Sequence, residues 1–193
     1  MNNNDLVIAN NLAYKINNNK LFSNISFKLQ SGESLHINGP NGCGKSTLIR
    51  IILGVTKPNK GDVRISKDHK ISYLGHKNAL KEYLSVEDNI SLLNFNDNIH
   101  LPKYLKFLQL NNLMDVYVSN LSFGQKKKLA LLRVFLNKSN IFLLDEPFVG
   151  LDSYSHEFLH TFLTNELKHG KCLIFTSHIK TDFNSKNIIL GKS

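Results

Sequence analysis

Residues 39–47 read GPNGCGKST, and this segment is the starting point for the fold. It fits the spacing G-x-x-x-x-G-K-[ST], in which a glycine-rich loop between a strand and a helix wraps around phosphate groups. Residues 34–38 before it predict a short strand, and residues 45–53 after it predict a helix that Gly54 ends. Because the motif stands in this order of strand, loop and helix, we expect nucleotide binding rather than a chance glycine-rich turn.

This phosphate loop, residues 39–47, carries the groups that bind a nucleotide. Its glycines let the backbone curl so that N–H groups converge on phosphate oxygens, and the helix that follows adds the positive end of its dipole. Lys45 is expected to reach the β- and γ-phosphates, and Ser46 is expected to offer its hydroxyl to Mg²⁺. The predicted nucleotide-binding residues are Gly39, Pro40, Asn41, Gly42, Cys43, Gly44, Lys45, Ser46 and Thr47.

A second segment, IFLLDEP at residues 141–147, delivers two carboxylates at the end of an apolar strand. Ligands of α/β sheets bind at the carboxyl ends of the strands, so both acids are expected beside the phosphate loop. Asp145 is the predicted Mg²⁺ ligand, directly or through water, and Glu146 is placed to polarise the water that attacks the γ-phosphate. His178 follows the next apolar strand and is the candidate for sensing the γ-phosphate, with a structural histidine as the alternative.

The rest of the chain places strands and helices around a helical middle. Residues 85–136 are mostly helical, with Ser85 as the expected N-cap of the first helix and with breaks near Pro102 and at residues 111–112. Residues 154–168 predict a helix with one apolar face. Further strands are predicted at 21–29, at 172–176, and as a pair at 63–65 and 71–74. The pattern predicts an α/β fold with an inserted helical lobe.

The composition fits one domain with an anionic partner. The chain has 193 residues, of which 41% are hydrophobic, and its net charge of +9 suits nucleotide, nucleic acid or lipid headgroup without choosing among them. Cys43 and Cys172 cannot form a disulfide framework, so a reducing compartment is expected. No apolar run approaches the roughly 20 residues that span a bilayer, and the N-terminus lacks the pattern of a secretory signal. We therefore expect a soluble, cytosolic protein that reaches a membrane only through a partner.

The segment LSFGQ at residues 121–125 completes a set of motifs. Together with the phosphate loop, the acid pair and His178, it resembles the ATP-binding cassette (ABC) ATPases over essentially the whole chain. The resemblance implies a P-loop NTPase of ABC ATPase type, with a mostly parallel RecA-like sheet core, an antiparallel β subdomain and an inserted helical subdomain at about 80–138. It also implies a single ABC ATP-binding domain over residues 1–193 that hydrolyses ATP with Mg²⁺.

The resemblance assigns further residues. The signature residues Ser122, Phe123, Gly124 and Gln125 would contact the γ-phosphate of ATP held by a second ATPase subunit, with Phe123 standing where the family usually has glycine. Asp152 matches the loop that crosses this dimer interface. Tyr14 is the candidate for stacking on adenine, with strand packing as the alternative. The partners implied are a second ATPase subunit and integral membrane transporter subunits, and no nucleic acid is expected.

His76 stands where the family usually has a glutamine that helps to hold Mg²⁺ and links to the membrane subunit. Whether His76 ligates Mg²⁺ is open, because a neutral imidazole is a poorer partner for Mg²⁺ than an oxygen. The segment YLGHKNALKEYLSVEDNI, from residue 73, is similar to the cassettes that export haem for cytochrome c biogenesis. That resemblance implies a peripheral subunit on the cytoplasmic face of the inner membrane, with residues 76–89 as the first candidate for docking.

Two further sequence patterns and three other functions are compatible with parts of this chain. His156 and His160 fit the zinc pattern H-E-x-x-H, with His169 nearby, but the helix needs its apolar side for packing. The lysines at 126–128 read either as a patch for nucleotide or lipid headgroups or as a solvated helix face. The other functions are the ATPase of a different ABC transporter, a soluble ABC ATPase acting on nucleic acid or ribosomes, and a nucleotide-binding module without turnover.

Overall fold

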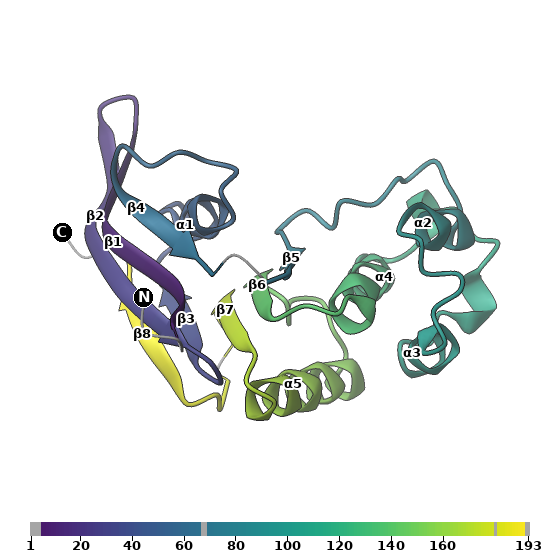
Figure 1. Cartoon of the computed structure of the whole chain (residues 1–193). Coiled ribbons are helices and arrows are strands. Elements are labelled where there is room, and N and C mark those ends of the chain that lie inside the picture. Colours follow the sequence, from purple (N-terminus) through teal and green to yellow (C-terminus); the bar gives the residue numbers. More distant parts are fainter. Residues whose placement is uncertain (1–4, 67–68, 180, 192–193) are drawn as a thin grey trace.

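The computed structural model describes residues 5–66, 69–179 and 181–191, so the first four residues of the N-terminus lie outside the described part. Its backbone forms two sheets with helices between and beside them (Figure 1). A three-stranded antiparallel sheet has the order β2-β1-β4, from β1 (Asp5–Ile16), β2 (Asn19–Gln30) and β4 (Lys60–Ile65). A five-stranded parallel sheet has the order β5-β6-β7-β3-β8, from β3 (Ser34–Asn38), β5 (Ile71–Leu74), β6 (Ile141–Asp145), β7 (Cys172–Thr176) and β8 (Ser185–Ile189). The predicted α/β class with a parallel core and an antiparallel sheet is confirmed.

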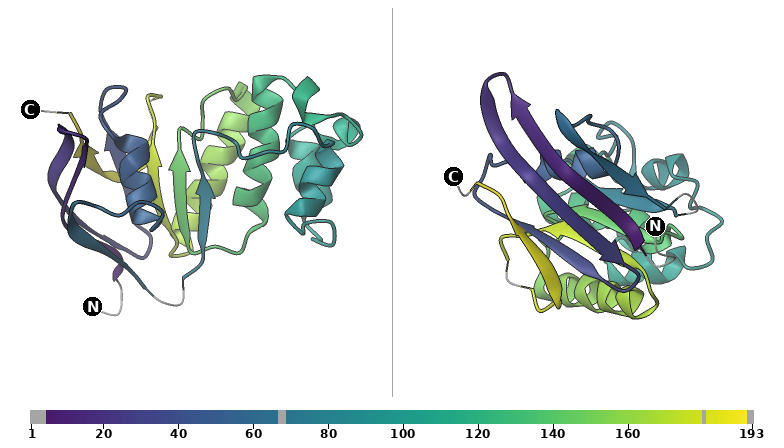
Figure 2. Two further views of the ribbon diagram at one scale, coloured as in Figure 1. Left: turned by 90° about the horizontal axis from the view of Figure 1, so that it is seen from above. Right: turned by 60° about the vertical axis from the view of Figure 1, so that its left-hand side comes forward.

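The helices cover both faces of the parallel sheet. Helix α1 (Lys45–Ile52) lies between the two sheets, whereas α4 (Phe123–Leu136) and α5 (Ser153–Lys168) cover the other face of the parallel sheet (Figure 1). The short helices α2 (Val86–Leu92) and α3 (Leu101–Phe107) lie at the end of the molecule remote from the antiparallel sheet (Figure 2). Single 3₁₀ turns cover Asn111–Leu113 and Val118–Asn120. None of the described helices combines the length and the apolarity that crossing a bilayer requires.

The central strands β6 and β7 divide the interior into two cores. Ile141 and Leu143 of β6 pack into the core with α1 and the antiparallel sheet, and Phe142 and Leu144 pack into the core with α4 and α5. Because side chains alternate along a strand and both faces are covered, every residue of β6 and β7 is buried. This burial on both faces explains why the two strands are continuous apolar runs.

Several local predictions are met. Ser85 caps α2, and its hydroxyl accepts from the Asp88 N–H while the Asp88 carboxylate accepts from the Ser85 N–H. Helix α5 covers the predicted residues, and Gly170 follows its last turn with a φ of 80°. The predicted break near Pro102 separates α2 from α3, and Pro102 itself lies in the first turn of α3, where its missing N–H is harmless.

The strand pair at 63–65 and 71–74 was wrong as a pair. Both segments are strands, but β4 pairs with β1 in the antiparallel sheet and β5 pairs with β6 in the parallel sheet. Strands β1 and β8 were not predicted from the sequence. In β1, a register irregularity beyond Ala9 places Asn11 in a left-handed conformation with a φ of 49°, which interrupts the alternation that marks a strand.

Candidate functional site

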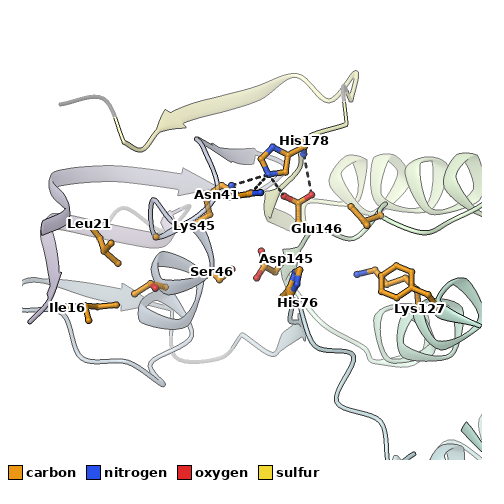
Figure 3. Close-up of a pocket in the computed structure, with 15 residues that line it drawn as sticks. Ile16, Leu21, Asn41, Lys45, Ser46, His76, Lys127, Asp145, Glu146 and His178 are labelled. Atoms are coloured by element: carbon orange, nitrogen blue, oxygen red, sulfur yellow. Dashed lines mark hydrogen bonds and ion pairs between the residues drawn. The ribbon is translucent and has the colours of Figure 1, made fainter. Parts of the chain in front are cut away.

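The candidate site lies where three parallel strands end side by side. The phosphate loop follows β3, Asp145 ends β6, and His178 follows β7 by two residues. The carboxyl ends of parallel strands meet at one edge of a sheet, so the three segments converge. They line an open pocket of about 570 Å³ (Figure 3). The structure therefore brings together residues that are far apart in the sequence, such as Lys45 and His178, which are 133 positions apart.

The phosphate loop depends on backbone conformations that glycine adopts. Gly39, Gly42 and Gly44 have φ values of 146°, 82° and 102°. At Gly39 a Cβ atom would lie 2.6 Å from the carbonyl oxygen of Leu190, so a side chain would also collide with the backbone. Gly44 is the N-cap of α1 and offers no side chain to cap it, which leaves the N–H groups of the first turn free to bind an anion.

Lys45 is almost fully buried and folds back over its own loop. Its Nζ donates to the carbonyl oxygens of Gly39 at 2.8 Å and Pro40 at 3.2 Å. Ser46 lines the same pocket beside it. The ammonium of Lys45 thus sits beside the uncapped first turn of α1, and this combination of a cation and a helix N-terminus attracts phosphate.

The two acids at the end of β6 are buried and are held by Thr176, the last residue of β7. The Thr176 hydroxyl donates to Asp145 Oδ1 at 2.7 Å and accepts from the Glu146 N–H at 2.9 Å. Glu146 has a φ of 50°, a strained conformation for a residue with a side chain, and its hydrogen bond to Thr176 helps to hold it there. Strain of this kind gathers at functional sites.

His178 connects the phosphate loop with Glu146. Its Nε2 atom lies 3.2 Å from Lys45 Nζ and 3.1 Å from Asn41 Oδ1, and its backbone N–H donates to Glu146 Oε2 at 3.3 Å. Glu146 Oε1 lies 3.4 Å from His178 Nε2 but is buried without a hydrogen-bond partner in the part of the chain that the structure describes. A buried carboxylate oxygen without a partner is suited to accept from a water molecule.

The pocket offers oxygen donors of the kind that Mg²⁺ prefers. The Ser46 hydroxyl and the Asp145 carboxylate both line it, and such hard donors together with phosphate oxygens suit Mg²⁺. His76 lines the same pocket, but its imidazole is a poor ligand for Mg²⁺. Within the described ranges no group of three His, Cys, Asp or Glu side chains could hold a metal ion by itself. The residues present fit a magnesium ion that shares its shell with a bound nucleotide.

The signature segment opens α4 with a reciprocal cap. The Ser122 hydroxyl accepts from the Gln125 N–H at 3.2 Å, and Gln125 Oε1 accepts from the Ser122 N–H at 2.8 Å. The helix therefore begins at Phe123. Phe123 is 62% exposed and lines the pocket, and its ring lies against Gly150. The signature and the loop after the acid pair are thus in contact.

Asp152 joins α5 to the signature helix. Its carboxylate caps α5 by accepting from the Ser155 N–H at 2.8 Å, and it forms an ion pair with Lys128 at 2.6 Å. The hydrogen bond from Lys128, followed by that from Ser155, lowers the pKa of Asp152 to about 2. Lys128 and Lys127 are buried, so the interpretation of residues 126–128 as a solvated helix face was wrong for both. Lys126, by contrast, pairs with the exposed Glu82.

Tyr14 lies outside this pocket. It lines a separate hollow on the antiparallel sheet, and its ring stacks on Phe22 with centroids 6.3 Å apart. Ile16 and Leu21, at the hairpin end of the same sheet, line the pocket instead. The sequence offered no reason to choose them over the aromatic residue.

The two histidines of the zinc pattern have aromatic neighbours. His156 packs on Phe148 with ring centroids 4.6 Å apart, and His160 stacks on Phe183 at 4.4 Å. The structure describes no third ligand near them, since no metal-binding group of three residues occurs in its described ranges. These contacts account for both side chains as part of the packing of α5.

Comparison with known proteins supports the geometry. Residues 22–149 match the protein family described as ABC transporter. The chain is 38% identical over 155 residues to the cytochrome c biogenesis ATP-binding export protein CcmA of Gluconobacter oxydans, covering 80% of this chain and 72% of that protein. It is 36% identical over 176 residues to the CcmA protein of Bartonella henselae, covering 86% of this chain and 84% of that protein.

Solved structures have the same fold. An ATP-binding subunit of an ABC transporter superimposes with a TM-score of 0.83 at 23% identity, over 96% of this chain and 85% of that one. A post-hydrolysis dimer of the ATP-binding cassette MJ0796 bound to ADP and Pi superimposes with a TM-score of 0.79 at 24% identity, over 96% of this chain and 94% of that one. At these identities the likeness establishes the fold.

Proposed function

This chain belongs to the ABC transporter family, and on that premise we propose that it is the ATP-hydrolysing subunit of an exporter that serves cytochrome c biogenesis. The observation that carries the hydrolytic part is the convergence of Lys45, Glu146 and His178 within contact distance at one edge of the parallel sheet. The part concerning cytochrome c biogenesis is supported by the names of relatives that match most of the chain.

In this proposal each side chain has one task. The N–H groups at the uncapped start of α1 and the ammonium of Lys45 bind and orient the phosphates of ATP, because such donors stabilise the negative charge of the phosphate oxygens. Ser46 and Asp145 would hold Mg²⁺, which when bound would neutralise negative charge on the phosphates of ATP. Glu146 accepts a hydrogen bond from the attacking water and receives its proton.

His178 and the signature complete the proposed mechanism. His178 already contacts both the phosphate loop and Glu146, so a hydrogen bond from it to the γ-phosphate would report the presence of that phosphate to the carboxylate. Ser122, Phe123, Gly124 and Gln125 would act on the nucleotide of a second subunit, with Asp152 at the interface between the two. Hydrolysis would then reopen the dimer and convert the nucleotide state into motion.

The proposed partners are a second ATPase subunit and integral membrane subunits, with haem as the exported molecule. A peripheral position on the cytoplasmic face of the inner membrane follows from this assignment. The segment 76–89 is the proposed docking surface: His76 lines the nucleotide pocket at one end, and Tyr83 is exposed in the middle. Such a segment could transmit nucleotide binding to a membrane subunit. A soluble cassette acting on nucleic acid or ribosomes is not favoured, because the relatives named above are export proteins.

Purification of the protein from native membranes, with identification of its co-purifying subunits, tests the proposal. We expect membrane proteins of cytochrome c assembly in stoichiometric amounts, and ATP hydrolysis by the purified complex. Recovery of ribosomal or DNA-repair proteins instead would overturn the transporter assignment. A complex that contains membrane subunits of another transport system would retain the ATPase assignment and remove the assignment to cytochrome c biogenesis.

A further inference from the structure

Lys127 is a buried lysine whose amine faces the nucleotide pocket. It belongs to α4, is only 3% exposed, and lines the pocket together with Lys45, Asp145 and Glu146. Figure 3 shows its amine directed toward Asp145 and His76, on the side of the pocket opposite the phosphate loop. The side chain therefore reaches the pocket from the signature helix of the same subunit.

The amine of Lys127 differs from those of its neighbours on α4 in its contacts within the described residues. Lys126 and Lys128, its neighbours on α4, form ion pairs with Glu82 at 3.0 Å and with Asp152 at 2.6 Å. No hydrogen bond or ion pair of Lys127 occurs in the described part of the chain. The side chain is buried along its length, but its Nζ atom is not one of the fully enclosed polar atoms that lack a partner, so the amine opens into the pocket. An ammonium held in this way can form a charge-assisted hydrogen bond with an anionic ligand.

Burial and the nearby acids act on this lysine in opposite directions. Burial lowers the pKa of Lys127 to about 8, and the charges of Asp145 and Glu146 offset part of that effect. An anion bound in the pocket would favour the ammonium form further. The ammonium of Lys127 thus borders the pocket at a position where an anionic group can approach it.

We propose that Lys127 is a second phosphate-binding lysine of the nucleotide site and that it holds the terminal phosphate of ATP from the side opposite Lys45. This inference rests on the proposed function, because it places ATP on the phosphate loop. Lys45 and Ser46 belong to one wall of the pocket and Lys127 to the other, so a polyphosphate between them would give the ammonium of Lys127 an anionic partner. Lys127 would then distinguish ATP from ADP.

The simpler alternative is that Lys127 only balances the charge of the acid pair. The contacts of the acids argue against it. Asp145 Oδ1 accepts from Thr176, and Glu146 Oε2 accepts from the His178 N–H, whereas neither acid forms an ion pair with Lys127 in the described structure. A charge-balancing lysine would also influence ATP and ADP equally, which makes the two roles separable.

Equilibrium binding of ATP and of ADP in the presence of EDTA, which prevents hydrolysis, tests the inference. For Lys127→Met we expect ATP binding to weaken by about tenfold to a hundredfold, the effect of losing a charge-assisted hydrogen bond, with ADP binding changed less than about twofold. Lys127→Arg should retain much of the preference for ATP. Lys126→Met is the matched control, because its partner Glu82 is exposed, and it should bind both nucleotides like the wild type.

Thermal unfolding supplies a second readout. Without nucleotide, Lys127→Met should melt at or above the wild-type temperature, because methionine fills the space without a buried charge. The increase in Tm that ATP causes should shrink, while the increase that ADP causes should stay. Unchanged ATP binding in Lys127→Met, or an equal loss for ATP and ADP, would overturn the inference. A wild-type chain that binds neither nucleotide would instead overturn the proposed function.

Discussion

The Nζ atom of Lys45 lies 3.2 Å from the Nε2 atom of His178. This contact joins the loop after β3 to the loop after β7, and Lys45 also donates to two carbonyl oxygens of its own loop. The same Nε2 atom lies 3.1 Å from Asn41 Oδ1, so an ammonium donor and an amide acceptor both approach the imidazole of His178. Phosphate oxygens form stronger, charge-assisted hydrogen bonds with an ammonium than an imidazole does, so a bound nucleotide would take Lys45 from His178.

Lys45→Ala should weaken ATP binding by at least about a hundredfold, because the variant loses the charge-assisted hydrogen bonds to the phosphates. Titration with a fluorescent ATP analogue measures this loss. Lys57→Ala, at an exposed lysine outside the pocket, is the control and should bind like the wild type. Unchanged affinity in a folded Lys45→Ala variant would refute the assignment of the phosphate loop.

Glu146→Gln should retain ATP binding and lose hydrolysis by about 100-fold to 10,000-fold, the contribution of a general base. Glutamine keeps the shape of the side chain and can still accept from the His178 N–H, but it cannot take a proton from water. Phosphate release and nucleotide affinity, measured on the same preparation, separate the two effects. Normal turnover would remove the role given to Glu146.

Thr176→Val should lower both the stability and the hydrolytic rate. The hydroxyl of Thr176 is fully buried and bridges Asp145 and the backbone of Glu146, so valine leaves the Glu146 N–H without its acceptor. An unsatisfied buried donor costs about 1–3 kcal/mol, which denaturant unfolding measures. Thr176→Ser keeps the hydroxyl and should retain most of the rate. Equal behaviour of the two variants would contradict the bridging role.

Much of the fold could be predicted because its decisive strands are buried on both faces. The runs at β6 and β7 are continuous and apolar, and the phosphate loop marks the end of β3. Strand β1 was not predicted, because Asn11 interrupts the alternation of its side chains between the two faces of the sheet. The partners of β4 and β5 could not be known, because pairing depends on where the chain crosses between sheets and not on the local pattern.

The parts of the site that lie in one contiguous motif could be predicted from the sequence. The residues that come together only through folding were missed. The phosphate loop and the acid pair are contiguous in sequence. Thr176 is placed beside Asp145 by the register between β6 and β7, which the sequence does not state. Lys127 looked like part of a solvated run of lysines, because its burial depends on how α4 packs. The register and the packing of α4 are therefore what the structure adds.

Gly124→Ala should destabilise the protein, although alanine normally stabilises a helix by about 1 kcal/mol relative to glycine. In the first turn of α4 a Cβ at this position would lie 2.7 Å from the carbonyl oxygen of Gly150, and backbone cannot yield as a flexible side chain does. The Tm of the variant measures the net effect. Asn165→Ala, at an exposed position of α5, is the control and should leave Tm unchanged or raise it. An increase of Tm in Gly124→Ala would show that the signature helix can move away from the loop that carries Gly150.

The lowered pKa of Asp152 makes the free energy of unfolding depend on pH in the acid range. Its hydrogen bonds from Lys128 and from the Ser155 N–H lower its pKa to about 2 from the ordinary value of 3.8. Folding therefore favours the ionised carboxylate, and the stabilisation is fully present above pH 3.8 and is lost as the pH falls toward 2. Because the side chain is 48% exposed, the contribution should be below about 1 kcal/mol.

The comparison with Asp152→Asn isolates this contribution, because asparagine still caps α5 but carries no charge for Lys128. Denaturant unfolding is measured from about pH 6 to about pH 2, the range in which carboxylates titrate. The free energy of unfolding should be larger for the wild type than for Asp152→Asn at the upper pH, and this difference should shrink as the pH falls. Lys128→Met should reduce the same acid dependence, since it removes the main cause of the lowered pKa. An advantage of the wild type that persists undiminished at the lowest pH would mean that the cap geometry, and not the ion pair between α4 and α5, stabilises this joint.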